Sequence, residues 1–479
     1  MNYSEFFKMV PEAILVVILI AVFFGDFALK NGERKNSMLY KLTGVLLTGM
    51  VVLLLCASGS EPVSAFGGLY VTSKAVNVMK AILALGSLIV VVMAQPWLES
   101  NDTARNLSGE FYMLLLSTLL GMFVMMSSGN FLLFFLGLET ASVPLACMVA
   151  LDKWKRNSAE GAAKYILVAT FSSGVMLYGI SFIYAATGTL YFDDVAAALS
   201  VSPLTIMGLV FFFSGLGFKI SLVPFHFWTA DTYEGAPTPV TGYLSVISKG
   251  AAALTLCIIL MKVFQPLVYY WEYLLYIVIV LSITIANLFA IRQSELKRFM
   301  AISSISQAGY IMLAVVGNSQ MGVAALSYYV LVYIVANMAV FTVINVVEQK
   351  NGRTDMAAYN GFYQTNPKLS FLMTLALFSL AGIPPFAGMF SKFFVFMAAA
   401  EQGSAAAYFV VFVALVNTVV SLYYYLLIVK AMYITKTDTP LPTFKSDYST
   451  RAALAICTVG VALFGICSCI YEWIAAAGL

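Results

Sequence analysis

The feature that most constrains this chain is a series of about fourteen apolar segments, which together take up nearly all of its 479 residues. A helix of about 20 apolar residues crosses the roughly 30 Å hydrocarbon layer of a bilayer. Hydrophobic residues make up 61% of the chain and charged residues only 10%, which lies outside the usual range of soluble domains. We therefore predict an all-α integral membrane protein of about fourteen transmembrane helices, with little room for a soluble domain.

Positive charge is unevenly distributed between the links that join these segments. Most of the 26 lysine and arginine residues fall in links after odd-numbered segments, for example in the clusters at 153–156 and 297–298. Because cytoplasmic loops are enriched in lysine and arginine, these links are predicted to face the cytoplasm. Both termini would then lie on the opposite side, which for a bacterial inner membrane is the periplasm. Acidic Glu5 and Glu12 precede the first segment, so we expect a retained helix and not a cleaved signal peptide.

Cysteine and histidine usage limits the cofactors that the chain could bind. The six cysteines are scattered, and the closest two, Cys467 and Cys469, point to different sides of a helix, so their spacing predicts neither a metal site nor a disulfide framework. The single histidine, His226, excludes a bis-histidine haem, and no glycine-rich phosphate loop follows a strand. We expect no cofactor, metal or catalytic redox site in this chain, and a lipid bilayer around it with no nucleic-acid partner.

Some ionisable residues fall within the predicted spans, where a charge costs from a few to more than about ten kcal/mol. They are Glu139, Lys164, Lys219, Lys249 and Lys392. Each is a candidate functional residue for that reason. Two alternatives stay open, because Lys164 is close enough to the basic side to reach the interface and the others could form structural ion pairs. Lys80 is assigned to a span end, and Glu139 is expected to be the only carboxylate deep in a span.

The segments are arranged as two sets of five. Spans 4–8 occupy residues 111–262 and spans 9–13 occupy residues 263–433, preceded by a three-helix segment at 1–110 and followed by one helix at 434–479. An odd number of spans in each set turns the second copy upside down in the membrane, so we predict two inverted five-helix repeats. The fourth span of each set, helices 7 and 12 of the whole chain, is predicted to be broken.

Proline and glycine mark these two breaks. Helix 7 carries Gly-x-x-x-Lys up to Lys219 and then Pro224, and helix 12 carries Pro384 and Pro385 followed by Gly-x-x-x-Lys up to Lys392. Proline removes a backbone donor, so the freed carbonyl groups need water or side chains inside a protein-lined cavity. Half-helix ends at mid-membrane are where transporters bind ions. The alternative is that glycine and proline are simply common in membrane helices.

Lysine is suited to proton transfer inside a membrane, because burial disfavours its charged form while a nearby carboxylate favours it. Connecting water could be ordered by polar residues on the predicted helices 6, 8, 10 and 11, although serine in membrane helices also serves helix packing. These residues are Thr170, Ser172, Ser173, Ser245, Ser248, Ser303, Ser304, Ser306, Gln307, Tyr328, Tyr329, Tyr333 and Asn337. His226, just after the helix 7 break, could relay protons or serve as a structural hydrogen-bonding residue.

The stretch PFHFWTADTYEGAPTPVTGYLSVISK at 224–249 resembles the helix 7–8 signature of subunit N in the antiporter-like membrane subunit family of bacterial NADH:quinone oxidoreductase, respiratory complex I. Residues 135–139, 162–174 and 295–310 extend the resemblance, which covers about 110–430. The sister subunits L and M commonly read Leu-Pro-Asp-Ala after the tryptophan, unlike this chain. Ala230 stands where the family usually has proline, a departure that leaves the charged positions unchanged.

The resemblance implies an antiporter-like proton channel. It implies that Glu139 is the helix 5 carboxylate paired with Lys219, that Lys249 is the central relay and that Lys392 lies nearest the exit. It further implies that NADH, FMN, iron–sulfur clusters and quinone are bound by partner subunits, among them other antiporter-like membrane subunits of complex I. We expect a proton-translocating subunit coupled to quinone reduction elsewhere in the complex. The alternative function is a subunit of a multi-subunit Na⁺/H⁺ antiporter.

Overall fold

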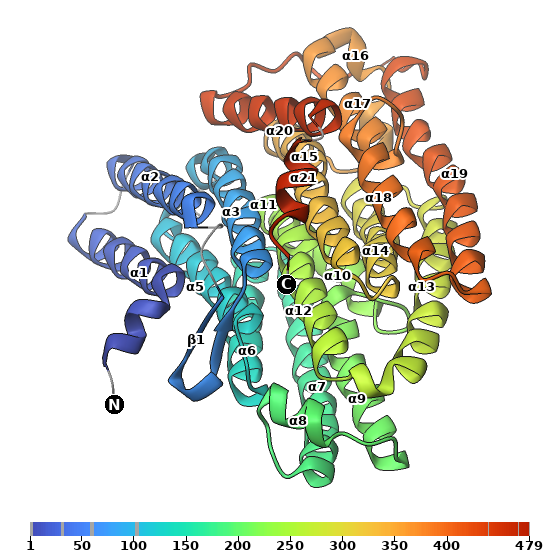
Figure 1. Ribbon diagram of the computed structural model, residues 1–479. Helices are drawn as coiled ribbons and strands as arrows, with labels where there is room; N and C mark the ends of the chain where they lie inside the picture. The colour runs from blue at the N-terminus through green and yellow to red at the C-terminus, as the bar shows by residue number, and fades with distance from the viewer. Residues whose placement is uncertain are drawn as a thin grey trace.

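The computed structural model describes residues 3–29, 33–57, 62–100, 105–438, 440–467 and 469–478, and it is helical almost throughout (Figure 1). In this part of the chain, 13 helices are long and apolar enough to cross a membrane. One further predicted crossing, the broken helix 12, is made of two short helices in succession, Pro367–Ala381 and Ala387–Glu401. The predicted all-α membrane fold, with about fourteen crossings, is confirmed.

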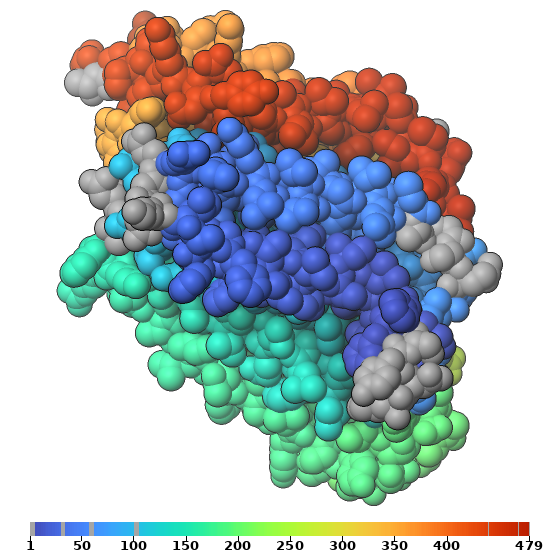
Figure 2. All heavy atoms as spheres, turned by 90° about the vertical axis from the view of Figure 1, so that its left-hand side faces the viewer, coloured from blue at the N-terminus to red at the C-terminus, as the bar shows by residue number. Residues whose placement is uncertain are grey.

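The N-terminal segment contains three long helices and a small antiparallel sheet. Its elements are η1 (Tyr3–Lys8), α1 (Val10–Ala28), α2 (Glu33–Ala57), β1 (Val63–Ala65), η2 (Phe66–Gly68), β2 (Tyr70–Thr72) and α3 (Lys74–Ser100). The two strands pair with Ser64 opposite Val71. Figure 2 shows these helices side by side on one face, with C-terminal helices above them and the first repeat below.

The first five-helix set contains the first break. Its elements are α5 (Ser108–Met126), α6 (Phe131–Val149), α7 (Arg156–Thr187), α8 (Phe192–Ala198), α9 (Pro203–Ile220), α10 (Phe227–Gly235), α11 (Thr238–Tyr243), η3 (Leu244–Ser248) and α12 (Lys249–Lys262). The helix 7 that the sequence predicts to be broken is divided into α9 and α10 at residues 221–226. The next crossing, α11 to α12, is continuous but contains the π-helical turn η3 immediately before Lys249.

The second set repeats this plan, and one more crossing follows it. Its elements are η4 (Gln265–Leu267), α13 (Val268–Ala290), α14 (Leu296–Val316), α15 (Gln320–Asn351), η5 (Met356–Tyr359), α16 (Phe362–Thr365), α17 (Pro367–Ala381), α18 (Ala387–Glu401) and α19 (Ala405–Tyr433), followed by α20 (Tyr448–Ile466) and α21 (Cys469–Ala475). The second predicted break therefore separates α17 from α18. Helix α20 packs across α15 and α3.

The two breaks end their first half-helix in the same way. Ser221 after α9 and Gly382 after α17 both have a positive φ, at 68° and 90°. In each case the next backbone N–H reaches back to the carbonyl five residues earlier, from Leu222 to Gly217 and from Ile383 to Phe378. This capping pattern satisfies carbonyl groups that a helix end would otherwise leave unpaired inside the membrane. The matched caps support the structural repeat.

Three helices form the centre of the molecule. The apolar stretches of α14 and α15 are buried along their whole length, and the crossing formed by α11 to α12 is buried over most of it. The outer helices α1 and α19 expose most of their surface instead. Polar side chains on α12, α14 and α15 are consequently surrounded by protein and not by lipid, which makes this centre the place where charge is tolerated.

A buried ion pair joins the first turn of α1 to the second turn of α3, close to the span end where the sequence places Lys80. Lys80 of α3 is fully buried, and its Nζ lies 2.6 Å from Oε1 of Glu12 on α1. The hydroxyl of Tyr70 donates to Oε2 of the same carboxylate over 3.0 Å, and the ammonium lies over the rings of Tyr70 and Phe123. Glu12 is buried although it lies in the first turn of α1, because it is surrounded by tertiary contacts that the sequence does not reveal.

Replacing Glu12 by glutamine should destabilise the protein, because it leaves the Lys80 ammonium buried without a counter-charge. Removing one partner of a buried pair costs about 3–5 kcal/mol, whereas replacing both by apolar residues is often close to neutral. We expect the thermal unfolding midpoint to fall in Glu12→Gln and to recover largely in the double variant Glu12→Leu/Lys80→Met. An unchanged midpoint in the single variant would show that the pair does not stabilise the fold.

Candidate functional site

Three of the lysines singled out from the sequence lie buried in the central region. Lys219 ends α9, Lys249 begins α12 and Lys392 lies in the second turn of α18; none is more than 4% exposed. We refer to Lys219, Lys249 and Lys392 as the lysine row. Within the described residues, no carboxylate forms an ion pair with any of them.

Lys219 is bound by two hydroxyl groups. Its Nζ donates to Ser142 Oγ of α6 over 2.7 Å and to the Tyr165 hydroxyl of α7 over 3.0 Å. It sits in the last turn of α9, where the helix dipole and the terminal carbonyl groups favour a cation. The position of the break therefore places this lysine at the negative end of a half-helix inside the protein.

Glu139 lies on α6, one turn before Ser142, but it does not contact Lys219 directly. It is half-buried, and it accepts a hydrogen bond from Ser173 Oγ of α7 over 2.5 Å. Because residues three apart share a helix face, Glu139 and the Lys219 partner Ser142 lie on neighbouring positions of α6. The carboxylate can thus influence Lys219 across Ser142 without an ion pair being present in this structure.

Lys249 follows the π-helical turn and contacts a second helix. Its Nζ donates to Ser304 Oγ of α14 over 2.7 Å and lies 5.4 Å from the centre of the Tyr233 ring. Just before it in the π-turn, Ser245 accepts a hydrogen bond from the Asn337 side chain of α15. π-Turns are frequent at functional positions because they interrupt regular helix bonding.

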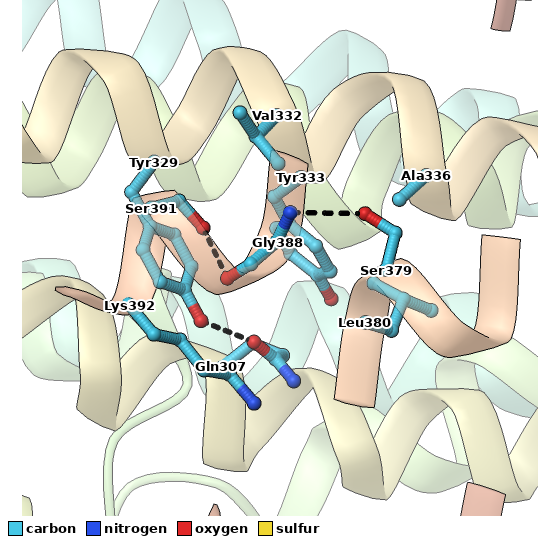
Figure 3. Close-up of a pocket in the computed structure, with 10 residues that line it drawn as sticks. All are labelled: Gln307, Tyr329, Val332, Tyr333, Ala336, Ser379, Leu380, Gly388, Ser391 and Lys392. Atoms are coloured by element: carbon cyan, nitrogen blue, oxygen red, sulfur yellow. Dashed lines mark hydrogen bonds between the residues drawn. The ribbon is translucent and has the colours of Figure 1, made fainter. Parts of the chain in front are cut away.

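Lys392 lines a small cavity that has both polar and apolar walls. Its Nζ donates to the Ala381 carbonyl, the last residue of α17, over 3.0 Å, and it lies 5.1 Å from the Tyr310 ring centre. This cavity of about 10 Å³ is lined by the side chains of Gln307, Tyr329, Tyr333 and Ser391, among others (Figure 3). A cavity of this size with polar groups in its wall accommodates about one water molecule.

A line of hydrogen bonds runs along α14 from the surroundings of Lys249 to this cavity. Ser303, next to the Lys249 partner Ser304, accepts from the Tyr425 hydroxyl over 3.0 Å. Gln307 Nε2 donates to the same hydroxyl over 3.3 Å, and Gln307 Oε1 accepts from Tyr329, which lines the cavity. Four polar side chains therefore form a hydrogen-bonded line between the surroundings of Lys249 and the cavity beside Lys392.

Lys164 and His226, the remaining site candidates from the sequence, lie outside this line. Lys164 is half-exposed and forms ion pairs with Glu160 and Asp231, at 2.7 Å and 2.6 Å. Asp231 also pairs with Arg298, so Lys164 belongs to a charge network at the basic side of the molecule. His226 is buried against the Phe227 ring, and its Nδ1 has no partner in the described structure. Within the described residues, neither forms a hydrogen bond or ion pair with the lysine row, although His226 is close enough to Lys249 for their charges to interact.

Several residues of the site were not singled out from the sequence. They are Ser142, Tyr165, Tyr233, Tyr310 and Tyr425, which come from α6, α7, α10, α14 and α19. Ser142 follows Glu139 by three residues and Tyr165 follows Lys164 directly, and these helical offsets were the available signal. Tyr233, Tyr310 and Tyr425 approach the lysines only because helices that are far apart in the sequence pack together.

The chain is similar to a family of membrane transport proteins. The family model described as NADH:quinone oxidoreductase/Mrp antiporter, TM, matches residues 128–421. A protein named NADH-quinone oxidoreductase subunit N from Phocaeicola vulgatus is 55% identical, over 98% of each chain. A protein of the same name from Azobacteroides pseudotrichonymphae is 47% identical, over 99% of this chain and 98% of its own.

Solved structures agree with this similarity. A chain of respiratory complex I from Thermus thermophilus, with bound aureothin, is 32% identical and superimposes with a TM-score of 0.82, over 98% of this chain and all of its own. A chain of the Mrp complex from Dietzia superimposes with a TM-score of 0.86 at 19% identity, over 100% of this chain and 97% of its own. The second similarity concerns the fold alone.

The close packing of α17 against α18 at the second break can be tested by substitution. A Cβ added to Gly388 of α18 would overlap with the Ser379 carbonyl of α17, whereas one added to Gly174 of α7 meets open space. We expect Gly388→Ala to separate the two half-helices, lower the thermal unfolding midpoint by several degrees and reduce the amount of folded protein. Gly174→Ala is the matched control and should behave as the unmodified protein. Equal stability of the two variants would contradict the α17–α18 packing.

Proposed function

The chain belongs to the family of NADH:quinone oxidoreductase and Mrp antiporter membrane subunits, and on this basis we propose that it carries protons across the membrane along Lys219, Lys249 and Lys392. It is a multi-pass membrane subunit of an NADH:quinone oxidoreductase, like its subunit N relatives. Proton movement through this chain would be driven by quinone reduction in other subunits, with no redox chemistry of its own.

The observation that carries the proposal is the kind of partner that each buried lysine has. The structural pair Lys80–Glu12 binds a full counter-charge at 2.6 Å. The lysine row is bound instead by neutral oxygen atoms, from serine and tyrosine hydroxyls and one backbone carbonyl. A lysine held by neutral groups can release its proton without leaving an unpaired carboxylate in the interior.

Hydroxyl partners suit both protonation states of a lysine. A serine or tyrosine hydroxyl accepts a hydrogen bond from an ammonium, and after rotation it donates one to the lone pair of the neutral amine. Ser142, Tyr165 and Ser304 thus keep Lys219 and Lys249 hydrogen-bonded before and after proton transfer. The line from Ser303 to Tyr329 would extend the transfer from Lys249 towards Lys392.

Glu139, Lys164 and His226 take supporting roles in the proposal. Glu139 stands beside the Lys219 partner Ser142, so a movement of its carboxylate would favour or disfavour the charged form of Lys219. Lys164 and its network would supply protons at the basic side, and His226 would pass them near the helix break. The breaks at Pro224, Pro384 and Pro385 provide the interior space that the lysines occupy.

The family membership also suggests the surroundings of the chain. NADH, FMN, iron–sulfur clusters and quinone are expected in partner subunits, and other antiporter-like subunits of the complex are expected beside this one in the bilayer. We place the chain in the bacterial inner membrane with both termini on the periplasmic side. Residues 1–110, 111–262, 263–433 and 434–479 would act as the N-terminal segment, the two repeats and the final helix.

The alternative of a Na⁺/H⁺ antiporter subunit has weaker support. The Mrp chain shares the fold at 19% identity, whereas the relatives at 55% and 47% identity carry the name of an NADH-quinone oxidoreductase subunit. Proton pumping that depends on NADH oxidation, and not on sodium, distinguishes the two functions in membrane vesicles.

Lys219→Ala and Glu139→Ala should abolish most NADH-driven proton pumping while the complex still assembles. The first change removes a proton carrier, and the second removes the charge that acts on it. Acidification of inverted vesicles, measured with a fluorescent dye, reports pumping, and subunit content reports assembly. Lys262→Ala is the control, since Lys262 is half-exposed and paired with Asp193 away from the row. Pumping equal to wild type in both assembled variants would remove these residues from the path.

The variant Lys392→Arg tests whether Lys392 carries protons or only supplies a fixed positive charge. Arginine keeps the positive charge but does not release a proton near neutrality, so we expect pumping to fail. Lys392→Met should also fail, because it removes the proton-binding nitrogen. The same acidification assay, with assembly measured separately, checks both variants. Wild-type pumping by the arginine variant would make Lys392 a fixed charge that tunes its neighbours.

A further inference from the structure

Tyr233 of α10 lies between the first and second lysines of the row. Its side chain is fully buried, and its ring lies beneath the Lys249 ammonium at 5.4 Å. On the other side the ring packs against Trp228, with ring centres 6.1 Å apart. Trp228 in turn contacts Tyr165, the hydroxyl partner of Lys219, at 5.1 Å. The three aromatic rings therefore bridge the space from Lys219 to Lys249.

Tyr233 supplies the free polar group in this aromatic bridge. The indole N–H of Trp228 is occupied, because it donates to the Phe218 carbonyl over 3.1 Å. The Tyr233 hydroxyl has no hydrogen-bond partner in the described structure, although its phenol interacts electrostatically with Tyr165 and is close to Ser304, the partner of Lys249. The Tyr233 hydroxyl thus lies close both to Tyr165, the partner of Lys219, and to Ser304, the partner of Lys249.

An unpartnered phenol in a protein interior points to a bound water molecule. More than nine in ten buried polar groups have a hydrogen-bond partner, and ordered water often supplies it. Two further unpartnered atoms lie one turn apart on α15, the Tyr333 hydroxyl and the Asn337 side-chain oxygen, and the phenol of Tyr333 is close enough to Tyr233 to interact with it. Asn337 also binds Ser245 in the π-turn before Lys249. These groups offer several hydrogen-bonding partners to water at the start of α12.

We propose that the Tyr233 hydroxyl binds a water molecule that transfers protons between Lys219 and Lys249. This inference rests on the proposed function. It supplies the link between Lys219 and Lys249, which no direct hydrogen bond joins in the described part of the chain. Lys219 gives up a proton through the Tyr165 hydroxyl to the water, and the water gives another of its protons to the lone pair of neutral Lys249. One N–H bond breaks and one forms, the water is regenerated, and no electrons are transferred.

A purely structural role would depend on the ring and not on the hydroxyl. Tyr233→Phe keeps the ring, its packing against Trp228 and its contact with the Lys249 ammonium, and it removes only the oxygen. The matched control is Tyr359→Phe, because Tyr359 is also fully buried and its hydroxyl is also without a partner, but it lies in η5 outside the lysine row. Comparing the two variants distinguishes the effect of losing the hydroxyl at Tyr233 from the general effect of losing any buried hydroxyl.

The test measures NADH-driven acidification and NADH:quinone electron transfer in assembled complexes carrying Tyr233→Phe, Tyr359→Phe or Lys249→Met. We expect Tyr233→Phe to lower the protons pumped per electron severalfold and Tyr359→Phe to leave them unchanged. High-resolution electron microscopy should show water at the Tyr233 hydroxyl in the unmodified complex and none there in Tyr233→Phe.

Three results would overturn the inference. Wild-type pumping by Tyr233→Phe would exclude the hydroxyl from the path, and an equal loss in both phenylalanine variants would point to a general packing effect. Absence of water at the Tyr233 hydroxyl would also exclude it. The Lys249→Met variant separates failure of this inference from failure of the proposed function. If Lys249→Met loses pumping while Tyr233→Phe retains it, only the inference fails; if Lys249→Met also pumps normally, the proposed function fails with it.

Discussion

The main constraint on this structure is that several lysine side chains lie inside the membrane-spanning part of the protein, where a positive charge is costly. An ammonium group at bilayer depth is costly unless the protein surrounds it and supplies partners. This chain does so in two ways. Lys80 is neutralised by Glu12 in a closed pair, whereas Lys219, Lys249 and Lys392 are bound by hydroxyl and carbonyl oxygen atoms of neighbouring helices. In the first arrangement a carboxylate favours the charged form of the lysine, and in the second the hydrogen-bond partners carry no counter-charge.

The helix breaks make the second arrangement possible. A continuous helix has its carbonyl groups occupied, but a half-helix presents free carbonyl groups inside the protein. The end of α17 places one of these beside Lys392, which binds the Ala381 carbonyl. At the end of α9, the Phe218 carbonyl accepts from the Ser221 N–H and from the Trp228 indole. The completely buried α14 and α15 then exclude lipid from the polar line between Lys249 and Lys392. Because both halves of the chain contain a break, the protein has two half-helix ends inside it, each close to a buried lysine.

The sequence allowed the crossings, both breaks and the buried lysines to be predicted, because each depends on local composition. Glu12–Lys80 could not be predicted in this way, since the partners are 68 residues apart and meet only through packing of α1 against its neighbours. The roles of the Tyr165, Tyr233 and Tyr425 hydroxyls could not be predicted for the same reason. Tyrosine is frequent in this chain, and nothing in the local sequence distinguishes these three residues. The direct Glu139–Lys219 contact implied by family resemblance is replaced here by Ser142, a one-turn offset on α6 that only side-chain placement reveals.

The central claim is that the buried lysines of the row change protonation state while the complex works. Nitrogen NMR of membranes containing the complex labelled with ¹⁵N-lysine distinguishes a neutral amine from an ammonium, and Lys219→Met, Lys249→Met and Lys392→Met assign the signals. The account predicts that signals of these lysines move between the two positions when NADH and quinone are supplied, while the Lys80 signal stays at the ammonium position. Signals from all three that remain at the ammonium position during turnover would contradict it.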